Sequence, residues 1–208
     1  MKLIIFGASG GTGQELVKQA MAAGHDVTVF VRTPSRLMTQ HTQLKVVQGD
    51  VGDVAQVAVA VQGHDVVISA LGARRDSPKD LMATSAATLI AAMQTHGVRR
   101  LIWLTGAGVS DVGDGSSFVR TLMVGLMKLL SPQVLADSTR AFQVIKASDL
   151  DWTVVRAPRL KDGAKAGGYR AGFTPPGGKA LARADAAEFM LQQLSDPTYV
   201  RKAPLIGY

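Results

Sequence analysis

The segment GASGGTG, residues 7–13, has glycines at a spacing of three, directly after an apolar run. A turn that binds the pyrophosphate of a dinucleotide needs glycine because the turn is tight, the backbone approaches the phosphate, and the following helix packs closely on the strand. Backbone N–H groups at the helix N-terminus would then face the phosphate, with hydroxyls as further donors. The predicted phosphate-binding residues are Gly7, Ser9, Gly10, Gly11, Thr12 and Gly13.

The surroundings of this segment decide between a dinucleotide site and a purely structural glycine turn. The spacing is GxxGxxG rather than GxGxxG, which alone is weak evidence. A helical pattern from Thr12 to Ala23 follows, Gly24 is typical of the end of a helix, and a second apolar run begins at Asp26. Strand, loop, helix and strand together have the length of a βαβ unit, so this context predicts dinucleotide binding.

The residues after the second strand bear on the choice between NAD and NADP. An NAD site has an acidic residue there for the ribose 2′-hydroxyl, whereas a 2′-phosphate favours arginine. Between Asp26 and Asp50 the chain has no acidic residue, and Arg32 and Arg36 lie about one helical turn apart. Arginine binds phosphate through bidentate hydrogen bonds at fixed charge. The sequence therefore predicts NADP(H), and two solvated arginines are the alternative.

The ends of the third and fourth strands are also predicted to contact the cofactor. The third ends at Asp50 and Val51, where the carboxylate would accept from the adenine amino group and the Val51 backbone would hold the ring. Asp50 is equally well explained as a turn or helix cap. The fourth ends at Ala70, Leu71 and Gly72, in the crevice where the strand order of such a sheet reverses.

The catalytic and substrate-binding candidates follow the fifth and sixth strands. Thr105 ends the fifth strand, where its hydroxyl would face the nicotinamide or the substrate, although such a threonine is commonly a turn donor. Arg156, Pro158 and Arg159 would bind an anionic substrate such as a flavin phosphate, with a solvated basic loop as the alternative. No residues have the spacing of a metal site.

Short apolar runs alternate with helical patterns, which predicts an α/β fold with a Rossmann-like, doubly wound parallel sheet. The length of 208 residues fits a single NAD(P)-binding domain over 1–208, with a substrate region at about 106–132 and 157–182. The predicted strands are Lys2–Phe6, Asp26–Val31, Leu44–Val47, Asp65–Leu71, Arg100–Thr105 and Trp152–Arg156.

Capping residues and helical spacing predict the remaining elements. Residues 118–130 have apolar side chains at helical spacing, which predicts a core or subunit contact or an apolar lid over the substrate. The other elements are a helix from Ser77-Pro78 to Gly97, a short helix over 54–61 capped by Asp53, a last helix capped by Asp185, a strand over 169–173, and an edge strand over 203–206.

The net charge is +7, and the basic residues are scattered rather than gathered in an arm. Such a field attracts phosphorylated cofactors and anionic small molecules, and argues against a nucleic-acid partner. The chain has no cysteine, and its apolar runs are too short or too interrupted for a secretion signal or a membrane span. We therefore expect a cytoplasmic monomer or homodimer that acts on a small-molecule acceptor and does not contact a membrane.

Seven motifs spread over nearly the whole chain carry a family resemblance. They are GASGGTG (7–13), VTVFVRTPSRL (27–37), VVQGDV (46–51), ALGARRD (70–76), AAMQTHGVRRLIWLT (91–105), DLDWTVVRAP (149–158) and RADAAEFMLQQLSD (183–196). In combination they resemble the atypical short-chain dehydrogenases/reductases with an NmrA-like NAD(P)-binding domain, and within these the biliverdin-IXβ and flavin reductases. The resemblance implies a Rossmann core, NADP(H), and hydride transfer to a flavin, a quinone or a linear tetrapyrrole.

The departures from this family narrow the expected chemistry. Most short-chain dehydrogenases use Tyr-x-x-x-Lys for proton transfer, but this chain has Phe142 and Lys146 there, the latter interpreted as a solvated helix residue. At the positions that the resemblance gives to a substrate-contacting serine and histidine, it has Gly106 and Arg159, which argues against biliverdin specificity. We predict an NADPH-dependent reductase of a flavin, quinone or similar conjugated acceptor. A non-catalytic, NADP(H)-sensing NmrA-like regulator is the alternative.

Overall fold

The computed structural model describes residues 1–38, 41–73, 77–115, 125, 131–174 and 179–208. Within these ranges the chain forms an eight-stranded sheet and a separate pair of short strands, β7 (Leu160–Lys161) and β9 (Leu181–Ala182). The large sheet has the order β3-β2-β1-β4-β5-β6-β10-β8. Its strands are β1 (Lys2–Phe6), β2 (Asp26–Val31), β3 (Lys45–Gln48), β4 (Val66–Ser69), β5 (Arg100–Gly106), β6 (Asp151–Ala157), β8 (Arg170–Gly172) and β10 (Leu205–Gly207).

The pairing of the strands determines where a ligand can bind. All neighbouring strands are parallel except β8, which pairs antiparallel with β10 at one edge. β1 lies between β2 and β4, so the strand order runs outward in both directions from the centre of the sheet. The carboxyl ends of the parallel strands share one edge, and the crevice lies where the order reverses. The predicted doubly wound α/β fold is confirmed.

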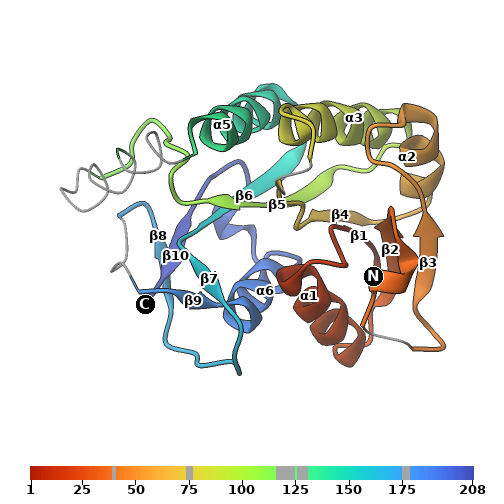
Figure 1. Cartoon of the computed structure of the whole chain (residues 1–208), viewed down its shortest axis with the longest axis horizontal. Helices are drawn as coiled ribbons and strands as arrows, with labels where there is room; N and C mark the ends of the chain where they lie inside the picture. Colours follow the sequence, from red (N-terminus) through yellow and green to blue (C-terminus); the bar gives the residue numbers. More distant parts are fainter. Residues whose placement is uncertain (39–40, 74–76, 116–124, 126–130, 175–178) are drawn as a thin grey trace.

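Helices cover both faces of the sheet (Figure 1). α1 (Gly11–Ala22) and α6 (Arg183–Gln192) pack on one face. α2 (Val54–Val61), α3 (Leu81–Thr95) and α5 (Pro132–Ala147) pack on the other. Two short 3₁₀ turns, η1 (Pro34–Arg36) and η2 (Pro197–Tyr199), complete these elements. Within the described ranges, every helix is too short or too polar to cross a membrane.

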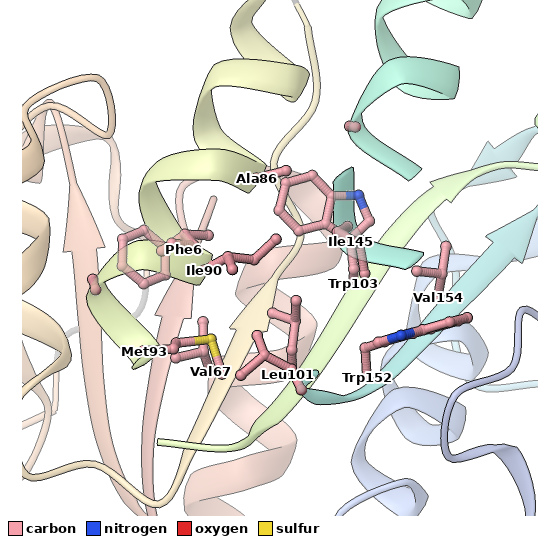
Figure 2. Close-up of a cluster of buried hydrophobic side chains, with 14 of the residues drawn as sticks. Phe6, Val67, Ala86, Ile90, Met93, Leu101, Trp103, Ile145, Trp152 and Val154 are labelled. Carbon is pink, nitrogen blue, oxygen red and sulfur yellow. The ribbon is translucent and has the colours of Figure 1, made fainter. Parts of the chain in front are cut away.

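The central strands are apolar along both faces because each face is buried under helices. Figure 2 shows the cluster beneath α3 and α5, where Trp103 and Trp152 from neighbouring strands lie next to Ile145 of α5. Along β1, Ile4 and Phe6 belong to this cluster, while the alternating Leu3 and Ile5 pack against α1 and α6. The two clusters fix the sheet between its helices and so hold the strand ends in place.

The start of α3 differs from the prediction. The helix begins at Leu81, not at Pro78, and its N-cap residue is Asp80, whose side chain makes no capping hydrogen bond. Instead the buried carboxylate of Asp137 on α5 accepts hydrogen bonds from the N–H groups of Met82, at 2.8 Å, and Ala83, at 3.1 Å. A carboxylate there also offsets the positive end of the helix dipole. The predicted cap of α2 is confirmed, since Asp53 accepts from the N–H of Gln56.

The C-terminal region contains two further corrections. Asp185 does not cap α6, which begins at Arg183. Its buried carboxylate accepts from the N–H groups of Ala166 and Gly167 and from the Tyr208 hydroxyl, so it ties a loop and the last residue to the helix. β10 is not an edge strand, because it lies between β6 and β8. The predicted helix over 118–130 falls outside the described residues except at position 125.

Candidate functional site

A cleft of about 700 Å³ opens at the carboxyl edge of the sheet, around the switch point between β1 and β4. Most of the residues that the sequence singled out for a cofactor line it, although they come from segments far apart in the chain. These are Gly7, Ser9, Gly10, Gly11, Thr12, Arg32, Arg36, Asp50, Val51, Ala70, Leu71, Gly72 and Thr105. Their contact with a cofactor stays a prediction.

The glycines of the first loop have separate structural causes. Gly7 has φ = +80°, and a Cβ there would lie 2.5 Å from the carbonyl oxygen of Ala70 at the end of β4. Gly13 is buried below the cleft rather than lining it, and a Cβ on it would lie 2.1 Å from the carbonyl oxygen of Gly7. A side chain on Gly7 would collide with the backbone at the end of β4, and one on Gly13 would push α1 away from the loop after β1. The turn and the helix packing are thus the reasons for these two glycines.

The loop also offers hydrogen-bond donors to an anion. The N-cap of α1 is Gly10, which has no side chain to accept from the N–H groups of the first helical turn. Those N–H groups and the positive end of the helix dipole therefore stay available at the cleft. Ser9 and Thr12 line the same part of the cleft. This donor set fits the pyrophosphate of a dinucleotide.

The segment after β2 supplies positive charge. Arg32 and Arg36 are exposed and line the cleft, Arg36 as the last residue of η1. Neither forms an ion pair with another residue in the described part of the chain. Asp50 lines the cleft, and its Oδ1 accepts from the N–H of Gly52 at 2.8 Å, which confirms its alternative interpretation as a turn cap.

The other end of the cleft is formed by the ends of β5 and β6 and by α5. Thr105, only 8% exposed, lies there with Pro158 and with Val134 and Ser138 of α5. The sequence analysis missed Ser138. Its signal was the helical spacing from Val134 through Ser138 to Phe142, but the side of α5 that faces the cleft depends on how this helix packs.

The two α5 residues at the Tyr-x-x-x-Lys positions lie away from the cleft. Phe142 is buried and packs edge-on against Trp152, with ring centroids 6.0 Å apart. Lys146 is not simply solvated, since its Nζ pairs with Asp111 Oδ1 at 2.5 Å and lies over the Phe142 ring. Neither residue lines the described part of the cleft.

Arg156 corrects the prediction of a substrate contact. Its side chain is completely buried and points away from the cleft. The guanidinium donates to the carbonyl oxygens of Val109 and Ala203 and forms a bidentate pair with Asp114. Every N–H group of the guanidinium donates a hydrogen bond, so Arg156 holds the 106–115 loop and the chain before β10 on the end of β6. Arg159 is exposed and does not line the described cleft, whereas Pro158 does.

Arg183, the first residue of α6, is a cleft residue that the sequence analysis did not single out. It lies against the glycine loop and pairs through Nη1 with Asp162 Oδ1 at 2.8 Å. The family resemblance included the motif that contains it, but only the packing of α6 beside α1 brings it to the cleft.

A family model described as NAD(P)H-binding matches residues 7–197, which include the glycine loop and α6. The chain belongs to this family. This confirms the predicted nicotinamide cofactor and the resemblance to NAD(P)-binding proteins. Among curated proteins, the chain is similar to the uncharacterized protein YwnB of Bacillus subtilis, with 25% identity over 206 residues that cover 96% of this chain and 94% of YwnB.

Two solved structures share the fold. One is ChuY, an anaerobillin reductase from Escherichia coli O157:H7, with a TM-score of 0.80 and 23% identity over 99% of this chain and 96% of that one. The other is a wide-type short-chain dehydrogenase/reductase from Veillonella parvula in complex with NADP, with a TM-score of 0.77 and 20% identity over 100% of this chain and 94% of that one.

Proposed function

We propose that this protein is an NADPH-dependent reductase that transfers hydride to a flavin, a quinone or a similar conjugated acceptor. The observation that carries the proposal is the set of ionisable groups in the cleft. Among the described lining residues these are Arg32, Arg36, Asp50 and Arg183. The described lining contains no tyrosine, histidine, lysine or cysteine, so it holds no side chain suited to deliver a proton near neutral pH.

Conjugated acceptors fit such a cleft because they take hydride into a ring and can be protonated by water. Bound NADPH would supply the hydride from its nicotinamide ring. The acceptor gains two electrons with that hydride and one proton from solvent, and leaves as the dihydro form. The chain then has to orient the two rings rather than act as an acid.

The residues at the inner end of the cleft are suited to that task. Thr105 and Ser138 place hydroxyls there that can position a carboxamide or a carbonyl oxygen. Leu81, Met82 and Val134 supply an apolar wall for a flat ring. We place the acceptor next to these residues.

The preference for NADPH over NADH rests on Arg32 and Arg36. Both line the cleft beside the end of β2, where the adenosine ribose of a dinucleotide lies in this type of fold. Their lack of an ion-pair partner in the described chain leaves both guanidinium groups available for a 2′-phosphate. The next acidic residue along the chain, Asp50, follows β3 rather than β2, and its Oδ1 already accepts from the N–H of Gly52.

The test is a steady-state assay of the purified protein with NADPH and, in turn, FMN, riboflavin and a quinone, followed by the absorbance of the reduced nicotinamide. We expect turnover with at least one acceptor, and a lower rate with NADH at equal concentration. Tight NADPH binding without turnover of any of these acceptors would refute the proposed reductase.

That negative result would favour a second candidate, a non-catalytic sensor of NADP(H). The specific observation in its favour is the same lack of a proton donor in the described lining. A sensor needs nucleotide binding to change its affinity for a partner, so binding without turnover is its signature.

A further inference from the structure

We propose that Arg183 binds the pyrophosphate of the dinucleotide beside the glycine loop, and that Asp162 competes with the phosphates for it. This inference rests on the proposed function, because it assigns a further residue to the same site. It adds to that site a cation from the C-terminal part of the chain, 170 residues after the end of the glycine loop.

The position of Arg183 is defined by its contact with the glycine loop. A Cβ placed on Gly11 would lie 2.7 Å from Arg183 Cδ and 2.8 Å from its Nε. Gly11 is the first residue of α1 and its φ is not positive, so backbone conformation does not require glycine there. The arginine side chain instead occupies the space that a Cβ on residue 11 would take. The guanidinium is thereby held beside the free N–H groups at the start of α1.

The backbone around Arg183 is fixed in this position. The Gln19 side chain of α1 donates to the carbonyl oxygen of Ala184 at 2.9 Å. The N–H of Ala182 donates to the Tyr208 hydroxyl, which itself donates to Asp185. These contacts join α6 to α1 and to the C-terminus, so the arginine is directed at the cleft before any ligand binds.

The present partner of Arg183 is weakly held. The Asp162 side chain is 90% exposed, whereas that of Arg183 is 28% exposed. An ion pair with so exposed a carboxylate contributes little, because water screens it. A pyrophosphate at the α1 N-terminus, next to Arg183, would offer two negative charges in a less hydrated place. Guanidinium groups bind such oxygens through paired donors, so exchange of Asp162 for phosphate is favourable.

The assignment predicts which nucleotides will respond to a change at Arg183. A pyrophosphate contact affects NADPH and NADH equally, because both contain this group. The Arg183→Gln variant is therefore expected to lose about 10-fold to 100-fold in affinity for both nucleotides. Binding of 2′-AMP, which has the 2′-phosphate but no pyrophosphate, should change less than about two-fold. Isothermal titration calorimetry of the full chain measures all three.

Arg99→Gln is the matched control, since Arg99 also forms an exposed ion pair with aspartate but at the opposite edge of the sheet. It should leave all three affinities unchanged. Asp162→Asn tests the competition in the other direction, on an exposed side chain whose loss does not threaten folding. It should bind NADPH and NADH about two-fold to five-fold more tightly, because Arg183 is released.

Three results would overturn the inference. Unchanged affinities in Arg183→Gln would make the arginine a structural tether, and a loss confined to NADPH and 2′-AMP would move it to the 2′-phosphate. Asp162→Asn binding no more tightly than wild type would remove the competition. Failure of the proposed reductase is distinguishable, since absence of turnover with intact, Arg183-dependent nucleotide binding refutes only that proposal.

Discussion

Replacing Asp114 by asparagine would break the buried ion pair that holds the loop after β5 to β6. The Arg156 and Asp114 side chains are 0% and 3% exposed, so water cannot take the place of the lost charge. Removing one partner of a buried pair typically costs about 3 to 5 kcal/mol, since an uncompensated charge remains. Arg156 keeps its bonds to the carbonyl oxygens of Val109 and Ala203, and asparagine still offers one acceptor. We therefore expect the lower end, about 3 kcal/mol.

The assay is urea unfolding followed by circular dichroism, with the free energy of unfolding extrapolated to water. Lys45→Ala breaks an exposed pair with Asp26 and should cost less than about 0.5 kcal/mol. Replacing both partners, as Arg156→Met with Asp114→Leu, should recover part of the lost stability because no buried charge is left. A loss below about 1 kcal/mol in Asp114→Asn would contradict the reasoning. So would a variant of normal stability with a raised KM for the acceptor, which would return Arg156 to the substrate site.

Three further predictions concern the cofactor, pH and the core. Arg32→Ala and Arg36→Ala should each weaken NADPH binding by about 1 to 3 kcal/mol and change the affinity for NADH little, as measured by calorimetry. Equal losses for both nucleotides would mean that neither arginine contacts the 2′-phosphate. Burial raises the pKa of Asp185, but hydrogen bonds from Tyr208 and two backbone N–H groups outweigh it and hold the pKa below the usual value. The stabilisation of the fold by the ionised Asp185 carboxylate is thus present above the unfolded-state pKa and is lost as the pH falls through the folded-state pKa. The difference in free energy of unfolding between wild type and Asp185→Asn should therefore shrink from about pH 6 to about pH 3. Ser69→Ala should raise the free energy of unfolding by about 0.5 to 1 kcal/mol in a urea titration, because the buried Ser69 hydroxyl has no hydrogen-bond partner among the described residues; a loss of stability would contradict this.

The cofactor half of the site could be predicted because its signals are local. Gly7, Arg32, Asp50 and Gly72 each follow a strand within a few residues, and the strands are recognisable from short apolar runs. Parallel strands bring their carboxyl ends to one edge whatever the details of packing. The assignment of the strands was therefore enough to predict that these segments lie around one cleft.

The rest could not be predicted, because it depends on contacts between segments far apart in the chain. Asp137 caps a helix that begins 56 residues earlier, which no capping pattern near Ser77 can reveal. Ser138 faces the cleft only because α5 packs with one side on the sheet. β10 enters the sheet between β6 and β8, although its short apolar run is typical of an edge strand.

The arginines mark the boundary between the two kinds of information. The sequence by itself determined the doubly wound sheet, the glycine loop and a cationic segment after β2, since these follow from periodicity, glycine spacing and residue type. Only the tertiary structure decided that Arg183 faces the cleft while Arg156 is buried against Asp114. The physical reason is that a guanidinium has the same charge in every setting, and the fold alone determines whether its partner is water, a phosphate or a buried carboxylate.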